Sequence, residues 1–536
     1  MNVGVRRSAV AAFLVVCLTG CTNRFEINSP ASAPTTTSKR NEGSPITGGT
    51  LRVGVESSVV TLDPTKNLQQ NVDVEVALAV YDPLVRYSRD PAHAGEAEPW
   101  LLTSWKVSDD AMHWTLKVRT GVTFHDGTPF DASSIVRNYE WRRAKGADCA
   151  CHLDSIASVT ASDPTTVQLT LTTPLPRFVQ EKLTKAEWYP VSPKLIDAHG
   201  DPNRDPDGTG PFVLVDRDTV TLHRSDHYWR KDDKGRQLPY LDRIRVIPLL
   251  DSQLRLTALQ NNDVDLIQTA DATTIAAGRK DTSLETQLTI ANSSTISMSN
   301  TSKPPFNDPR MRRVAALAFD RDAINNQAYG GNARPAHWLF PPGSPWHEEA
   351  ARYPDHDPVA ARKLLAQVVA EKGDSIRHFT ISCIKSPESD AVLQLVVQQF
   401  RDVGLDPTLE LVDQGTYVAK IISKSGNYQG GCYRSADAVD PAGHGESVKT
   451  GAPGNLTFYS NQRVDQLLEQ ADAERDDAKR RKLLSEFQKI LAAEGPFSPL
   501  VYGQWGNIAR PAVDGLPAAE IDSLGTVRLD SVWMGR

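Results

Sequence analysis

Several short stretches of the chain alternate apolar and polar residues, the pattern of strands with one buried face. We predict strands over residues 50–55, 114–118, 165–171, 212–215, 220–223, 379–384 and 408–412. Other stretches repeat apolar residues at helical spacing. They predict helices over residues 71–84, 132–139, 174–183, 306–324, 358–369 and 391–403, and two charged amphipathic helices that end before Pro496. Strands that alternate with helices predict an α/β fold with a partly parallel sheet.

The stretch from Leu116 to Asn138 joins one of these strands to a helix through a tight turn. Residues 124–130 read FHDGTPF, in which Asp-Gly and Pro supply the backbone angles of a turn. Asp131 is a suitable N-cap for the helix that follows. His125 and Asp126 are candidate catalytic residues by type, but no second catalytic partner stands at a matching spacing. We therefore expect both to hold the turn by hydrogen bonds.

Length and composition are those of a soluble globular protein with about three domains. The chain has 536 residues, of which 23% are charged and 40% hydrophobic, and its formal net charge is -7. This mild acidity argues against a nucleic-acid partner, which requires a basic patch. No segment repeats at a fixed period, so a solenoid is excluded.

The N-terminus has the features of an export signal. Arg6 and Arg7 precede an apolar run, residues 9–18, that is too short to span a bilayer. It ends in Leu-Thr-Gly-Cys21, which resembles the lipobox of bacterial lipoproteins and implies that Cys21 carries lipid. The alternative is an ordinary signal with a chance cysteine. The sequence leaves open whether export uses the general secretory or the twin-arginine route.

Residues 22–49 are rich in Ser, Thr, Pro and Gly and show no apolar period. Such a segment is a flexible tether with an average reach of about 30 Å. We expect the folded body to be held by a lipid anchor at the extracytoplasmic face of the cell membrane.

Cys149, Cys151 and His152 form a small cluster of possible metal ligands. A structural zinc site needs four ligands and a wider cysteine spacing, and no second cluster stands nearby. We predict no metal site and no cofactor. A local disulfide or an exposed loop remains open for these two cysteines.

The amino-acid sequence of this turn points to a particular protein family far more specifically than its conformation does. Residues 116–136 resemble the signature L-x-x-G-V-x-F-H-D-G-x-P-F-x-A-x-D-V, with Ser134 in place of the usual Asp. This is the signature of the family 5 extracellular solute-binding proteins, the peptide- and nickel-binding lipoproteins of ABC importers. Further motifs of that family occur in order from Gly49 to the end, including YDPLV at 81–85, GTGPF at 208–212 and RVAALAFDR at 313–321.

The resemblance implies a periplasmic-binding-protein-like α/β fold, type II and cluster C-like. It has two α/β lobes with a hinge and a third, smaller domain. Residues 1–20 would be the signal peptide and residues 21–48 the lipidated cysteine and tether. Lobe I would comprise residues 49–80, 203–297 and 499–536. The smaller domain II would comprise 81–202, and lobe III 298–498.

The resemblance also implies a function: capture of a solute, most readily a peptide, between the lobes and its delivery to the ABC permease subunits in the membrane. We expect a monomer that is not an enzyme. The alternatives are a non-peptide solute such as haem, a nickel complex or an oligosaccharide, and a non-transporting lipoprotein sensor. A secreted hydrolase is less favoured, because neither G-x-S-x-G nor H-E-x-x-H is present.

The resemblance finally implies site residues. In the family the strands that carry Cys383 and Cys432 line one sheet, so we predict a Cys383–Cys432 disulfide, with two buried thiols as the alternative. Peptide-binding members use an A-D-x-x-D/E-P stretch whose Asp pairs with the ammonium of the ligand. That position is Asp437 here, with Asp440 second. Arg434 stands where the family often has Trp and could meet an acidic ligand group, and Tyr433 completes the candidate set.

Overall fold

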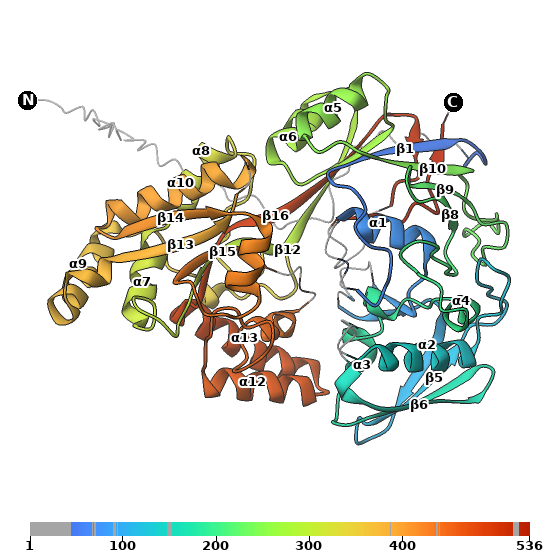
Figure 1. The fold of residues 1–536 in the computed structure, drawn as a ribbon, viewed down its shortest axis with the longest axis horizontal. Helices are drawn as coiled ribbons and strands as arrows, with labels where there is room; N and C mark the ends of the chain where they lie inside the picture. Colours follow the sequence, from blue (N-terminus) through green and yellow to red (C-terminus); the bar gives the residue numbers. More distant parts are fainter. Residues whose placement is uncertain are drawn as a thin grey trace, which may run out of the picture.

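The computed structural model describes residues 44–66, 68, 71–88, 93, 95–146, 149, 153–385, 387–435, 438, 440–517 and 525–535. Their backbone is organised around one ten-stranded mixed sheet (Figure 1). In spatial order its strands are β14 (Asp406–Val412), β13 (His378–Ile384), β15 (Gly430–Arg434), β12 (Glu285–Ser299), β16 (Phe497–Ala509), β11 (Leu266–Thr269), β1 (Thr50–Val55), β10 (Arg243–Pro248), β9 (Thr221–Arg224) and β8 (Phe212–Asp216).

The two ends of this sheet lie in different halves of the molecule (Figure 1). We use lobe I for the half with β1 and β8–β11, and lobe III for the half with β13–β15. The strands β12 and β16 run between the halves and pair antiparallel from Glu285↔Ala509 to Met298↔Phe497. We call β12 and β16 the hinge pair.

Helices cover each lobe, and a carboxylate N-cap marks most of their starts. Lobe I has α1 (Asn71–Val80), α5 (Ser252–Gln260) and α6 (Ala272–Lys280). Lobe III has α7 (Pro309–Ala318), α8 (Arg321–Ala328), η5 (Glu349–Ala351), α9 (Pro358–Lys372), η6 (Asp374–Arg377), α10 (Pro387–Asp402), α11 (Gln414–Tyr417), η7 (Val418–Ile422), η8 (Pro441–Ser447), α12 (Gln462–Ala473) and α13 (Asp477–Glu494). Asp251, Asp271, Asp357 and Asp476 each accept a bond from a first-turn amide, which satisfies a donor that the helix leaves free.

The smaller domain II carries its own four-stranded antiparallel sheet, in the order β4 (Leu102–Val107), β5 (His113–Val118), β7 (Thr166–Leu171) and β6 (Ile156–Asp163). Around it lie β2 (Val85–Tyr87), β3 (Ala97–Pro99), α2 (Ala132–Lys145), η3 (Leu153–Ser155), α3 (Phe178–Glu181), η4 (Ala186–Trp188) and α4 (Pro193–Asp197). A separate apolar core joins the sheet to α2 through residues such as Trp114, Phe130 and Tyr139. Near the C-terminus β17 (Val513–Asp514) pairs with β18 (Trp533–Met534).

Three predicted helices differ from those in the structure. Residues 306–324 form two helices, because Phe319 is extended and Asp320 starts α8 by accepting the amide of Ala323. The first helix ends at Val80, before Pro83, which disfavours a helical residue in front of it. Of residues 174–183 only α3 is α-helical. Among the described residues no helix is both long enough and apolar enough to cross a membrane.

The turn at residues 124–130 is held by hydrogen bonds to the segment that returns from domain II. His125 Nε2 lies 2.9 Å from the carbonyl oxygen of Gly210, and burial lowers the pKa of this imidazole. Asp126 accepts bonds from the Thr128 amide (2.8 Å) and the Ser192 hydroxyl (2.7 Å). These contacts support the expected role of His125 and Asp126, which is to hold the turn by hydrogen bonds.

Asp82 lies where domain II joins lobe I, and its side chain is fully buried. Its carboxylate accepts a bond from Trp100 of domain II at 2.7 Å and from Trp229 of lobe I at 2.9 Å. Arg528, near the C-terminus, donates to it at 2.9 Å. Thr209 adds a bond of 3.2 Å. One buried charge is thus shared by four segments that are far apart in sequence.

Asp82→Asn should lower the free energy of unfolding by about 3 kcal/mol, because the buried Arg528 loses the carboxylate that lies 2.9 Å away and is left with the more distant Asp530 at 3.9 Å. Urea unfolding followed by tryptophan fluorescence measures this. Asp226→Asn, at an exposed acid of lobe I, is the matched control and should change stability by less than about 0.5 kcal/mol. Equal effects of the two substitutions would contradict the assigned role of Asp82.

Candidate functional site

The predicted site stretch begins at the C-terminal end of β15, directly beside the hinge pair. Arg434 lies opposite Thr295 of β12, and Tyr433 lies opposite Ile296. The guanidinium of Arg434 stacks over the indole of Trp505 in β16, 4.8 Å from the ring centroid. A side-chain carbon on Gly503 would lie 3.5 Å from Arg434 Nη2. Arg434 therefore covers the face of β16 that carries Gly503 and Trp505.

Both residues at this strand end are accessible. Tyr433 is 41% exposed, and the partial burial of its ring raises the pKa of its hydroxyl. Arg434 is exposed as well, and within the described part of the chain it has no acidic partner. A guanidinium placed this way is available to a carboxylate, with which it can form two parallel charge-assisted bonds.

Asp440 has a different environment from the one expected of a ligand anchor. Its Oδ2 lies 2.9 Å from Nη1 of the buried Arg480. Its Oδ1 accepts the amide of Ala442 at 2.9 Å and so caps η8. Both carboxylate oxygens are engaged within lobe III, where they hold the start of η8. Asp437 lies outside the described residues, as does Cys21.

Trp505 and Gly503 belong to no motif from which a site was predicted. Residues 503–507 read Gly-Gln-Trp-Gly-Asn, and a period of two places Gly503, Trp505 and Asn507 on one face of β16. That alternation was readable in the sequence. The partner of this face, Arg434, comes from a strand 71 positions earlier and only the fold brings them together.

Cys383 of β13 and Cys432 of β15, the pair implied by the resemblance, are joined by a disulfide in the structure. The two strands are parallel neighbours in which Ser382 lies opposite Gly431, so the next residue of each lies side by side. Their Cα atoms are 5.4 Å apart, a normal separation for a disulfide. The bond ties β15, whose end carries Arg434, to the centre of the lobe III sheet.

Cys149 is also disulfide-bonded, but Cys151 and His152 of the same predicted cluster lie outside the described residues. Within the described ranges no three His, Cys, Asp or Glu side chains gather in a way that could hold a metal ion.

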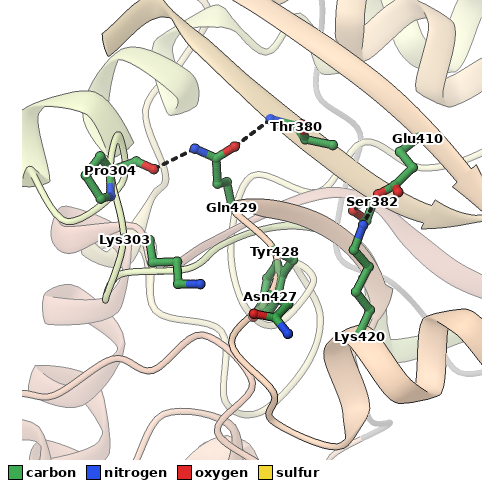
Figure 2. Close-up of a pocket in the computed structure, with 9 residues that line it drawn as sticks. All are labelled: Lys303, Pro304, Thr380, Ser382, Glu410, Lys420, Asn427, Tyr428 and Gln429. Carbon is green, nitrogen blue, oxygen red and sulfur yellow. Dashed lines mark hydrogen bonds and ion pairs between the residues drawn. The ribbon is translucent and has the colours of Figure 1, made fainter. Parts of the chain in front are cut away.

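A pocket of about 550 Å³ opens at the opposite end of β15 (Figure 2). The Gln429 side chain bridges the carbonyl of Pro304 and the amide of Thr380, and Lys420 pairs with Glu410, which also accepts from Ser382. Lys303 points toward the open space (Figure 2). None of the predicted site residues lines this pocket, so it is separate from the strand end that carries Arg434.

Domain II and lobe III also touch each other, at the turn between α12 and α13. Arg475 donates to the carbonyls of Ser108 and Asp109, at 2.6 and 2.9 Å. Arg177 lies 3.5 Å from Asp477. The two halves of the molecule are therefore linked at this contact as well as through the hinge pair.

Glu181 of α3 takes part in the same contact. Its Oε1 lies 3.7 Å from Nη2 of Arg480, the residue that also pairs with Asp440. The pKa of Glu181 is raised to about 7, first by burial and then by the nearby carboxylates Asp472 and Asp440, whereas Arg480 and Arg177 act to lower it.

The sequence matches a known protein family. The family described as bacterial extracellular solute-binding proteins, family 5, matches residues 96–441, more than half of the chain. The protein therefore belongs to the family 5 extracellular solute-binding proteins. The glutathione-binding protein GsiB of Escherichia coli O1:K1 / APEC is 29% identical over 468 residues, which cover 84% of this chain and 88% of that protein.

Solved structures show the same fold at lower identity. The substrate-binding protein CtaP of Listeria monocytogenes aligns with a TM-score of 0.79 at 22% identity, covering 91% of this chain and 100% of that one. DppA of Helicobacter pylori, in complex with the peptide STSA, aligns with a TM-score of 0.77 at 22% identity, covering 92% and 99%. NikA of Brucella suis, in complex with Fe(III)-EDTA, gives 0.79 at 21% identity, with 91% and 100% covered. The two-lobed fold with a smaller domain, expected from the sequence, is confirmed.

The disulfide yields a direct prediction. Non-reducing peptide mapping of the purified protein should find the Cys383 and Cys432 peptides linked. Cys432→Ser should lower the free energy of unfolding by about 2–4 kcal/mol, because the cross-link no longer restricts the unfolded chain. Reductant should destabilise the wild type by more than the Cys383→Ser, Cys432→Ser double variant. Two free thiols in the mapped protein would overturn the pairing.

The Glu181 contact predicts a pH dependence of stability. A carboxyl whose pKa is raised from its ordinary value near 4.5 to about 7 binds a proton on folding, so its contribution to stability falls as pH rises from about 5 to 8. Glu181→Gln cannot ionise and should lessen this fall by about 1–2 kcal/mol. Thermal unfolding at pH 5.5 and 8 measures the difference, with Glu140→Gln, an exposed acid of α2, as control. An unchanged pH dependence in Glu181→Gln would refute the assignment.

Proposed function

We propose that this protein is the extracytoplasmic receptor of an ABC importer, and that it captures peptides between its lobes and delivers them to a membrane permease. Membership of the family supports the general role. The glutathione-binding relative and the peptide complex of DppA support a peptide or a peptide-like solute. Lipid on Cys21 would anchor the receptor to the membrane, and the segment before residue 49 would act as its tether.

The observation that carries the proposal is the position of Arg434. It is an exposed guanidinium with no acidic partner in the described ranges, and it lies over the strand pair shared by both lobes. A solute carboxylate bound there would touch Arg434 of lobe III, whose guanidinium in turn lies against Trp505 of the hinge pair. Such a contact favours the arrangement in which the lobes enclose the solute, which is the requirement for ligand-driven closure.

The amine of the peptide is assigned to Asp437, which follows β15 by three residues. A carboxylate in an enclosed cleft gains from a charge-assisted bond to an ammonium. Asp440 is not a ligand contact in this proposal, since its carboxylate pairs with Arg480 and caps η8. Tyr433 would contribute ring contact beside Arg434.

A solute that is not a peptide is the second candidate. Arg434 would equally suit a polycarboxylate, and the NikA structure shows an iron–EDTA complex bound to this fold. Mass spectrometry of compounds released by denaturing the purified protein separates the two. Peptides among the released compounds support the first proposal, and one defined non-peptide compound supports the second.

Calorimetry with glutathione and tri-alanine tests the peptide assignment. N-acetylation of tri-alanine should weaken binding at least tenfold, because it removes a charge-assisted bond of about 1.5–3 kcal/mol. Asp437→Asn should show little difference between the free and acetylated forms. Arg434→Gln should lose the preference for a free C-terminal carboxylate over an amide, whereas Arg204→Gln, at an exposed loop arginine, should keep it. Equal binding of free and acetylated peptide to the wild type would contradict the assignment of Asp437 as the partner of the peptide's ammonium group.

A further inference from the structure

Domain II and lobe III meet on the side of the molecule that lies away from the hinge pair. The hinge strands cross the upper half of the view, whereas α12 and α13 approach α3 of domain II in its lower half (Figure 1). We call this meeting point the distal contact. The pairs that cross it are Arg475 with Ser108 and Asp109, Asp477 with Arg177, and Arg480 with Glu181.

The two connections between the halves differ in kind. The hinge pair is a backbone ladder, which cannot part without breaking hydrogen bonds along β12 and β16. Within the described ranges, no backbone–backbone hydrogen bond joins domain II to lobe III. The distal contact therefore depends on side chains, and it can open and close while each lobe keeps its fold. A solute that enters or leaves between the lobes would pass on this side.

One buried arginine lies at the centre of the distal contact. Arg480, at the start of α13, is 1% exposed. Its Nη1 lies 2.9 Å from Oδ2 of Asp440 in lobe III, and its Nη2 lies 3.7 Å from Oε1 of Glu181 in domain II. Asp472 of α12 is a third acid here, since its charge acts on both Glu181 and Arg480. Three carboxyl groups, two from lobe III and one from domain II, thus surround one guanidinium.

The other charged and titratable neighbours do not balance this excess of acid. Arg177 is directed to the carbonyl of Gly95 at 3.1 Å and to Asp477 at 3.5 Å. Lys182 acts on Asp472, and the hydroxyl of Tyr87 stays neutral because burial raises its pKa.

Glu181 itself is poorly stabilised as an anion in this contact. Its Oε1 is shielded from solvent and accepts no hydrogen bond. A buried acceptor without a donor is unfavourable, and more so when it carries charge. A proton on the carboxyl group removes the charge and relieves the repulsion from the two acids of lobe III.

We propose that the distal contact is a proton-linked latch: closing lobe III onto domain II places Glu181 against Asp440 and Asp472, and the carboxylate takes up a proton from solvent. Acid then favours the closed form and tighter capture of the solute. This inference rests on the proposed capture of a solute between the lobes. It adds that capture responds to the pH outside the cytoplasm.

The direction of the pH effect follows from what lobe III contributes. Parting the lobes removes Asp440, Asp472 and the burial by lobe III, which raise the pKa of Glu181, together with Arg480, which lowers it. That pKa is about 7 in the closed contact, against an ordinary value of 4.5. The contribution of Glu181 to closure is therefore fully present below about pH 4.5 and is lost as pH rises through about 7. Burial also raises the pKa of Asp472, which acts in the same direction.

Small-angle scattering of the solute-free protein tests the latch without assuming a ligand. The wild type should have a smaller radius of gyration at pH 5.5 than at pH 7.5, because acid populates the closed form. Glu181→Gln is neutral and of the same size, and should have the same radius at both pH values. Glu140→Gln, at an exposed acid of α2 in the same domain, should behave like the wild type.

Calorimetry with tri-alanine measures the coupling to solute binding. The wild type should bind about tenfold more tightly at pH 5.5 than at pH 7.5, and at pH 6 it should take up close to one proton per peptide. Glu181→Gln should lose most of both effects. The amino group of the peptide titrates identically with every variant, so the comparison between variants isolates Glu181.

Two arginine variants separate the latch from the general properties of lobe III. Arg475→Gln removes the bonds to the Ser108 and Asp109 carbonyls and should weaken tri-alanine binding severalfold at both pH values. Arg463→Gln is the matched control, because Arg463 of α12 pairs with Glu486 inside lobe III. It should bind like the wild type.

The outcomes distinguish the latch from the proposed function. Thermal unfolding first establishes that each variant is folded, and Asp472→Asn, which should weaken the pH effect, replaces Glu181→Gln if that variant does not fold. A wild-type affinity independent of pH, or a pH effect that the neutral variant keeps, overturns the latch while peptide binding stands. If tri-alanine binds at neither pH, the peptide function is contradicted and the scattering decides. Equal wild-type radii then refute the latch, and a difference abolished by the neutral variant supports it.

Discussion

The backbone ladder between β12 and β16 is the constraint on which the rest of the structure depends. These strands of 15 and 13 residues pair along their length, and each end of the pair lies in a different lobe. The register of the ladder decides which side chains share a face, because side chains alternate with a period of two. A slip of one residue would turn Trp505 and Asn507 to the opposite face. The ladder therefore joins the two lobes, and it also determines the face of β16 on which Trp505 meets Arg434.

The ladder is also irregular at two points, between Ile290 and Ser294 and between Thr295 and Ile296 of β12. Extra residues in one strand of a pair bend it and increase its local twist. The first irregularity lies between the part of β12 opposite the β11-bonded end of β16 and the part that pairs with β15, and the second lies at the start of that latter part. These two strands join the lobes, and the two irregular points are where their pairing is interrupted.

Buried arginines replace backbone pairing at the junctions that lack regular structure. Arg142 donates to the carbonyls of Glu187 and Tyr189, and Arg321 donates to those of Pro354 and Pro499. A planar guanidinium carries five donors in a fixed geometry, so one side chain can satisfy several loop carbonyls. Buried arginines also pair with carboxylates: Arg528 binds Asp82, and Arg480 binds Asp440.

Much of the fold could be predicted from local pattern. The strands at 50–55 and 379–384 and the cap at Asp131 follow from side-chain periodicity and short-range hydrogen bonding. The site was less accessible to such reasoning. The stacking of Arg434 on Trp505 depends on strand order, which no local pattern encodes. The break at Asp320 was missed because the apolar period continues across it.

The close approach of Gly208 and Gly210 to the end of α1 has a mechanical consequence. A side chain at either glycine would overlap the backbone of Val80, and the Gly210 amide donates to the Val80 carbonyl at 2.9 Å. The chain therefore enters and leaves domain II through two strands of backbone in direct contact, beside the buried Asp82. These touching crossings fasten domain II to lobe I over a short length of backbone. Lobe III is joined to the rest differently, through the hinge pair and the side-chain contact of Arg475 with Ser108 and Asp109.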